Sequence, residues 1–206
     1  MRLSDDFPKG FKYLPGYFFL EEQKELVDTL RYLVKEAPLF TPVMPRTGKP
    51  FSVRMTNLGT LGWVSDRSGY RYQSQHPETG QPWPVIPEVL LDLWNKVGDC
   101  PAAPEACLVN YYAATAKMGM HQDRDEKTFE APVVSVSLGD TAIFRLGGVK
   151  RGGPTQSLKL NSGDVVVLGG EARLCYHGID RIQGGSSSLL KDGGRLNLTL
   201  RRISPF

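Results

Sequence analysis

The sequence predicts a mostly β protein with flanking helices, in the α+β class, and two observations support this. After about residue 105, short β-rich runs alternate with turn residues, which is typical of a sandwich or barrel. Before that point, two segments repeat apolar residues every three or four positions, the spacing of amphipathic helices. A chain of 206 residues is long enough to bury a core and suits one domain.

The first predicted helix spans residues 21–37. Its apolar side chains share one face, Pro38 ends it, and we expect it to pack on a sheet. The second helix is predicted over residues 87–97, with a proline in its first turn, one apolar face, and Gly98 just past its end.

The remaining segments are predicted to be extended. Residues 41–84 are rich in Gly, Pro, Ser, Thr and aromatic residues, which predicts hairpins and loops that offer a binding surface. Further strands are predicted at 106–112, 117–121, 132–138, 141–146, 157–160, 164–168 and 195–203.

Composition excludes several classes of protein. With 40% hydrophobic and 23% charged residues, the chain is neither disordered nor membrane-spanning, and no apolar run reaches bilayer length. Two acids stand near the start, where a signal peptide needs a basic stretch, so we expect a cytoplasmic protein. Cys100, Cys107 and Cys175 lack CxxC spacing and are expected to be buried thiols. A net charge of +3 permits a polyanionic partner without requiring one.

Two of the three histidines belong to a candidate metal site. His121 and Asp123 are two residues apart, so in an extended segment both side chains project from one face. His177 follows a predicted strand by a short loop. Together they form a two-histidine, one-carboxylate set, which binds Fe(II) on one face and leaves the opposite positions for a co-substrate and O2. His76 lacks such neighbours and is expected on the surface.

The strand at 195–201 alternates polar and apolar residues without a break. Its two arginines, asparagine and threonine therefore share one face. Buried inside a barrel, this face would need an anionic ligand or acidic partners, and an arginine can grip a carboxylate through two hydrogen bonds. The alternative is that the face is solvated.

Five segments carry a family resemblance: NYY at 110–112, HQDRDE at 121–126, VSVSLG at 134–139, GDVVVLGGEARLCYHG at 163–178 and RLNLTLR at 195–201. In order and spacing they resemble the AlkB family of Fe(II)/2-oxoglutarate dioxygenases, over about residues 55–202. The resemblance implies a double-stranded β-helix (jelly-roll) core over about 106–206. It also implies an extension over about 1–105 with helices and a nucleotide-recognition lid, all in a single domain, 1–206.

The resemblance places iron on His121, Asp123 and His177. It places 2-oxoglutarate against Asn110, Tyr112, Arg195, Asn197 and Arg201, with Arg201 expected to hold the distal carboxylate. The implied reaction uses O2 and converts 2-oxoglutarate to succinate and CO2 while oxidising a methyl group on a nucleobase nitrogen. For 1-methyladenine or 3-methylcytosine the product then releases formaldehyde and restores the base.

The resemblance also implies substrate contacts. Asp125 is assigned to catalysis and substrate binding, because a carboxylate beside the pocket favours these cationic lesions; the alternative is a solvated turn acid. Glu126 beside it could equally be plain surface. The remaining expected substrate contacts are Met55, Trp63, Tyr70, Ser135 and Arg151.

A flipped or single-stranded base needs flat groups to stack on, and Trp63 and Tyr70 in the lid are the candidates. Trp63 could instead merely pack in the core. Tyr72 and four basic residues are expected to meet phosphates or, for Arg151, the base itself, although such basic residues are usually just solvated. The four are Arg67, Arg71, Lys150 and Arg151.

Three functional hypotheses follow. The leading one is a demethylase that repairs alkylated DNA, with single strands favoured and duplex DNA or RNA as further substrates. The second keeps the chemistry but moves the substrate to tRNA or protein, since a fold does not choose a substrate. The third is a binding module without turnover, against which the intact triad and the intact 195–201 strand count. We expect a monomer with no membrane partner.

Overall fold

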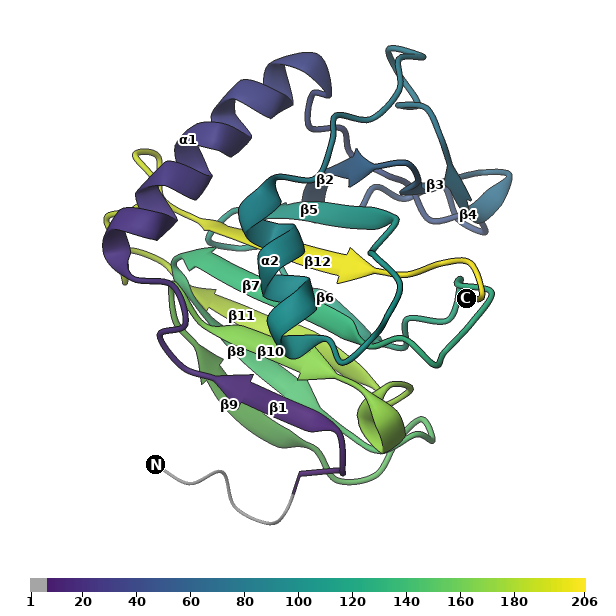
Figure 1. Cartoon of the computed structure of the whole chain (residues 1–206), viewed down its shortest axis with the longest axis vertical. Coiled ribbons are helices and arrows are strands. Elements are labelled where there is room, and N and C mark those ends of the chain that lie inside the picture. The colour runs from purple at the N-terminus through teal and green to yellow at the C-terminus, as the bar shows by residue number, and fades with distance from the viewer. Residues whose placement is uncertain (1–6) are drawn as a thin grey trace.

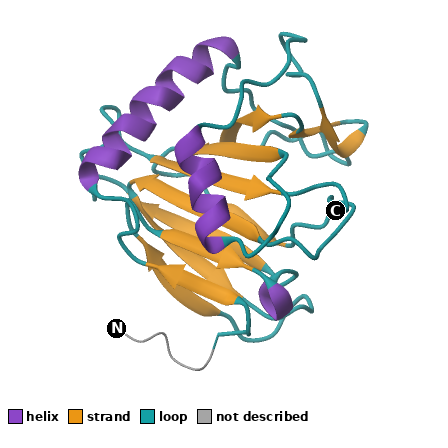
Figure 2. Ribbon diagram, in the orientation of Figure 1, coloured by secondary structure: helices purple, strands orange, loops and turns teal. Residues whose placement is uncertain are grey.

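The computed structural model describes residues 7–206, and its main feature is a pair of antiparallel sheets that face each other (Figures 1 and 2). The two acids that argue against a signal peptide, Asp5 and Asp6, lie outside the described residues. In chain order the elements are β1 (Phe11–Leu14), α1 (Leu20–Glu36), β2 (Val53–Gly59), β3 (Gly62–Asp66), β4 (Gly69–Gln73), α2 (Glu88–Val97), β5 (Ala106–Tyr112), β6 (Met118–His121), β7 (Val133–Gly139), β8 (Thr141–Leu146), β9 (Gln156–Leu160), β10 (Val165–Leu168), the short 3-10 helix η1 (Gly170–Ala172), β11 (His177–Gln183) and β12 (Arg195–Arg201).

The major sheet has six strands in the order β1-β10-β7-β12-β5-β2, and the minor sheet has four in the order β6-β11-β8-β9. From β5 to β8 the chain crosses between the sheets at every step, and it does so again from β9 to β12. This double crossing is the jelly-roll arrangement, so the predicted fold class is confirmed. The N-terminal region adds β1 and β2 to the two edges of the major sheet.

Strand alternation separates two faces of the major sheet. The outward residues Val134, Val136, Leu198 and Leu200 lie in a core with the buried faces of α1 and α2. Both helices lie over this face of the sheet in Figure 1. The inward face of the same strands carries the polar side chains described below, because successive residues of a strand point to opposite faces.

The helices and most strands lie where the pattern predicts them, while β1 and β11 were not predicted. β11 has the sequence HGIDRIQ, in which glycine and two charged residues interrupt the apolar pattern, so its start was taken for a loop. Within residues 7–206, no helix combines the length and apolarity needed to cross a membrane.

The β3–β4 hairpin stands beside the major sheet, and a small core cluster that includes Val64, Met55 and Leu108 joins the hairpin to β2 and β5. The expectation of a surface His76 is wrong, because this side chain is buried there between Phe40 and Trp83. Its Nε2–H donates to the Pro38 carbonyl oxygen at 2.8 Å, and its Nδ1 accepts from backbone N–H groups at 3.1 and 3.3 Å. His76 is therefore a structural residue of the hairpin region.

Candidate active site

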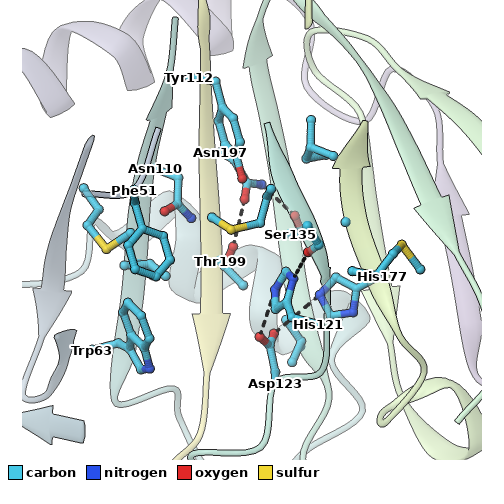
Figure 3. A pocket seen from close by; sticks show the side chains of 18 of the residues that line it. Phe51, Trp63, Asn110, Tyr112, His121, Asp123, Ser135, His177, Asn197 and Thr199 are labelled. Atoms are coloured by element: carbon cyan, nitrogen blue, oxygen red, sulfur yellow. Dashed lines mark hydrogen bonds and ion pairs between the residues drawn. The ribbon is translucent and has the colours of Figure 1, made fainter. Parts of the chain in front are cut away.

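A cavity of about 760 Å³ lies between the two sheets and is bordered on one side by the hairpin. Every residue assigned above to iron, 2-oxoglutarate or substrate lines it. Figure 3 shows His121, Asp123 and His177 gathered at one end, with Asn197 and Tyr112 further along the strands and Trp63 on another wall. The structure thus brings the predicted residues together.

The candidate metal ligands are placed by strand pairing. His121 ends β6 and lies directly opposite His177, the first residue of β11, with ring centroids 4.6 Å apart. Asp123 follows β6, and its carboxylate oxygens lie 3.7 Å from Nε2 of His121 and 3.9 Å from Nε2 of His177. The three ligand atoms lie within 4.8 Å of one another, a spacing that one ion can bridge. Two imidazoles and a carboxylate are the donor set that suits Fe(II).

The protonation states suit metal binding. Nδ1 of His121 and Nδ1 of His177 each donate to a backbone carbonyl, of Gly119 at 2.9 Å and Cys175 at 3.0 Å, which leaves both Nε2 lone pairs for a metal. Burial, together with the neighbouring His121, lowers the pKa of His177 to about 4, so its ring is neutral near pH 7. Burial alone would raise the pKa of Asp123, but Arg201 and the imidazoles hold it below its usual range.

A buried network of charges surrounds Asp123. Nη2 and Nε of Arg201 donate to Oδ2 of Asp123 at 2.9 and 3.2 Å, and the same Nε lies 3.5 Å from Glu126. Glu126 also pairs with Arg173 at 3.3 Å, and Arg173 donates to the backbone oxygen of Asp123 at 2.8 Å. Glu126 is 7% exposed, so the interpretation of it as plain surface is wrong. Two acids and two arginines balance in charge before any metal binds.

Arg173 was missed from the sequence. It lies in the loop before His177, where a single arginine carries no periodic signal. Its place in the segment GGEARLCYHG, next to a predicted ligand, was the only available hint.

The far end of the cavity holds polar atoms without partners. Nη2 of Arg195 donates to Ser137 at 2.9 Å, but Nε and Nη1, although buried, have no hydrogen-bond partner among the described residues. The same holds for Oδ1 of Asn110. The guanidinium lies 5.2 Å from the Tyr112 ring centroid, and burial lowers the pKa of Arg195. Unsatisfied buried donors of this kind fit an anionic co-substrate, since leaving them unpaired is costly.

This arrangement favours a different assignment within the 2-oxoglutarate pocket from the one expected. Arg201 was expected at the distal carboxylate, but it lies against Asp123 at the metal end. Arg195, six residues earlier on β12, is the arginine at the other end. Asn197 and Thr199 lie between them, and Asn197 donates to Ser135 at 2.7 Å, which ties β12 to β7.

The hairpin supplies the aromatic wall. Trp63 and Tyr70 stack on each other, with centroids 5.5 Å apart and planes 18° apart, so no third ring fits between them and they offer one joint platform. The indole N–H of Trp63 donates to Asp125 at 2.7 Å. Met55 on the edge strand β2 and Ser135 on the central strand β7 line the cavity, and Arg151 places its guanidinium 5.2 Å from the Tyr176 ring centroid.

The residues expected to meet phosphate separate into three groups. Tyr72 points inward and donates to Glu126 at 2.7 Å, which contradicts a phosphate contact in this conformation. Arg71 pairs with Asp66 at 2.8 Å. Arg67 and Lys150 are exposed and lie outside the cavity lining, where they stay candidates for phosphate.

Comparison with known proteins identifies the family. The sequence profile of the 2OG-Fe(II) oxygenase superfamily matches residues 10–201. An alpha-ketoglutarate-dependent dioxygenase AlkB homolog of Caulobacter vibrioides is 55% identical over 193 residues, which cover 94% of this chain and 87% of that protein. The chain belongs to the AlkB family.

Other AlkB relatives agree in sequence and in structure. The DNA N(6)-methyladenine demethylase ALKBH1D of Arabidopsis thaliana is 42% identical over 220 residues, covering 94% of this chain and 49% of that protein. The solved structure of OsALKBH1 superposes with a TM-score of 0.78 at 32% identity, covering 95% of this chain and 99% of that one. As an AlkB protein the chain is a dioxygenase that uses Fe(II), 2-oxoglutarate and O2, as predicted.

Proposed function

We propose that this AlkB protein removes N-methyl groups from the bases of alkylated nucleic acid, with 1-methyladenine and 3-methylcytosine in DNA as its leading substrates. The observation that carries the proposal is the Trp63–Asp125 hydrogen bond of 2.7 Å at the wall of the iron cavity. It joins a flat ring to a carboxylate. A methylated adenine or cytosine of this kind is flat and cationic, so it matches both features.

The inner residues would hold the metal and co-substrate. Nε2 of His121, Nε2 of His177 and the Asp123 carboxylate would hold the iron. Arg195 would bind the far carboxylate of 2-oxoglutarate, Asn110 lies level with Asn197 in the middle of the strands, and Arg201 lies at the metal end. The bound iron and 2-oxoglutarate supply the oxidising power: one oxygen atom of O2 goes into succinate, formed with loss of CO2, and the other into the substrate C–H bond. The resulting N-hydroxymethyl group loses its hydroxyl proton and leaves as formaldehyde, and the nitrogen keeps the electron pair of the broken C–N bond, which restores the neutral base.

The lid residues act on the substrate. A paired base hides its methylated edge, so the base must enter from a single strand or flip out of a duplex. The joint platform of Trp63 and Tyr70 gives it a stacking surface, and the walls of the cavity keep water from the reacting carbon. Single-stranded DNA is therefore the favoured substrate, with duplex DNA and RNA next. The cavity is lined by residues of one chain, which supports a monomer, and we propose that it acts in the cytoplasm.

The test is a panel of methylated single- and double-stranded DNA and RNA oligonucleotides, incubated with protein, Fe(II), ascorbate and 2-oxoglutarate and followed by mass. We expect loss of the methyl group and release of formaldehyde, with none from Asp123→Ala. No methyl loss from any oligonucleotide, together with succinate formation on methylated tRNA or protein, would favour the second hypothesis. Absence of 2-oxoglutarate turnover with every substrate would instead favour a binding module.

A further inference from the structure

The β3–β4 hairpin, which forms the lid, is joined by two hydrogen bonds to the loop after β6, which carries Asp123, Asp125 and Glu126. Trp63 on β3 and Tyr72 on β4 are directly opposite each other in the hairpin. Trp63 donates to Asp125 at 2.7 Å, and Tyr72 donates to Oε1 of Glu126 at 2.7 Å. Two cross-strand neighbours of the lid therefore hold two consecutive acids, just after the metal ligand Asp123.

The two acids differ in what lies behind them. Asp125 is exposed, and Trp63 is its one hydrogen-bond or ion-pair partner among residues 7–206. Glu126 is buried and faces Arg173 at 3.3 Å and Arg201 at 3.5 Å. A change at Asp125 is thus confined to the substrate side, whereas a change at Glu126 reaches the metal side.

Arg201 is the link between Glu126 and the iron ligand. Its Nε lies 3.2 Å from Oδ2 of Asp123 and 3.5 Å from Oε1 of Glu126, so one N–H group stands between two carboxylates. The Tyr72 hydroxyl occupies part of the hydrogen-bonding capacity of that same Oε1. Without the hydroxyl, Glu126 would draw Nε of Arg201 toward itself and away from Asp123, because a buried carboxylate replaces a lost donor with the nearest one.

We propose that Tyr72 is a positioning residue that couples the β3–β4 hairpin to the metal centre through Glu126, Arg201 and Asp123. This chain of contacts, here called the relay, rests on the metal site assigned above. The further idea that it signals the entry of a base under the lid rests on the proposed function. Because coupling between two sites is reciprocal, metal binding at Asp123 stabilises the hairpin, and a closed hairpin tightens metal binding.

The test compares Tyr72→Phe with Tyr13→Phe in the full chain, without nucleic acid. Tyr13 is a matched control, because its hydroxyl also donates to a buried carboxylate, that of Asp164, at 2.8 Å. Tyr13 lies on β1 and outside the cavity lining. Amide hydrogen exchange in β3 and β4 is measured with and without Mn(II) and 2-oxoglutarate. The affinity for Co(II) is measured from the visible absorption of the bound Co(II) ion. Thermal unfolding of each metal-free variant confirms that it folds.

We expect metal to slow exchange in the hairpin of the wild-type protein and of Tyr13→Phe, and to have little effect in Tyr72→Phe. Co(II) affinity of Tyr72→Phe should fall about tenfold, the lower end of the range for residues that support metal ligands. Equal metal protection of the hairpin and equal Co(II) affinity in the two variants would overturn the proposal.

A second pair of variants keeps the test decisive if Tyr72→Phe does not fold. Glu126→Gln and Asp125→Asn each remove one carboxylate charge from an acid held by a lid aromatic. The relay predicts weaker Co(II) binding for Glu126→Gln alone, and equal losses in both would contradict it. Since no oligonucleotide is present, failure here leaves the proposed demethylation standing, and failure of demethylation leaves the relay standing.

Discussion

The barrel interior and the lid hairpin hold their functional groups in different ways. In the barrel, strand register fixes the groups: His121 pairs opposite His177, and the polar face of β12 lies between β5 and β7. In the lid, a two-stranded hairpin carries Trp63 and Tyr70, which stack on each other, and the indole N–H of Trp63 donates to Asp125 in the loop after β6. We propose a division of labour on this basis, in which the barrel binds iron and co-substrate and the lid selects the substrate.

The largest effect is expected when the negative charge of Asp123, inside the barrel, is removed. Asp123→Ala deletes an iron ligand and leaves Arg201 and Arg173 buried with one acid between them. Losing one partner of a buried ion pair costs about 3–5 kcal/mol, so we expect that decrease in the free energy of unfolding and no 2-oxoglutarate turnover. Urea denaturation and succinate assays measure the two effects. Stability equal to that of the wild type would show that the network contributes little.

The next prediction separates the two ends of the cavity. Arg195→Lys keeps a charge but loses the two-pronged guanidinium, and a hydrogen bond to a charged group is worth about 1.5–3 kcal/mol. The KM for 2-oxoglutarate should therefore rise about 10- to 100-fold while metal affinity is unchanged. Arg201→Lys should instead weaken metal binding, because Arg201 contacts Asp123. Steady-state kinetics measure the KM of each variant, and Co(II) titration measures its metal affinity. A raised KM for Arg201→Lys together with weaker metal binding for Arg195→Lys would instead assign Arg201 to the distal carboxylate.

Among the lid residues, a change at Trp63 should alter substrate use alone. Trp63→Ala removes a stacking surface worth about 1–3 kcal/mol per base, so kcat/KM for a methylated oligonucleotide should fall about 10- to 100-fold. The KM for 2-oxoglutarate should stay the same, because Trp63 contacts none of the residues that are assigned to 2-oxoglutarate binding. Trp63→Phe, which keeps a ring, serves as the control. A parallel loss in 2-oxoglutarate binding would erase the distinction between barrel and lid.

The smallest expected effect concerns charge selectivity. Asp125 is exposed, and an exposed ion pair contributes about 0.2–1 kcal/mol. Asp125→Asn should therefore lower the preference for cationic 1-methyladenine over a neutral methylated base by a few-fold, and added salt should reduce the preference in the wild type. Competition between the two lesions in one reaction measures it. An unchanged preference would make Asp125 an ordinary turn acid.

The same comparison explains what could be predicted from the sequence. The period of two on β12 predicts that Arg195, Asn197, Thr199 and Arg201 share a face, and all four line the cavity. Side-chain alternation does not tell which arginine meets an acid from another segment. That depends on the loop after β6, which places Asp123 against Arg201.

Longer-range packing accounts for the other misses. Glu126, Arg173 and His76 were placed on the surface or overlooked, yet all three are buried. Each has its partner far away in the chain or in a loop backbone: Arg173 forms an ion pair with Glu126, and His76 bonds the Pro38 carbonyl oxygen. Local pattern carries no signal for such contacts.

The most direct test of the division between barrel and lid follows succinate and methyl removal together, in one reaction with a 1-methyladenine oligonucleotide. For the wild-type protein we predict one succinate formed per methyl group lost. For Trp63→Ala we predict that succinate continues to form while methyl removal largely stops. Loss of both in equal proportion, or succinate without any methyl removal by the wild type, would contradict the account.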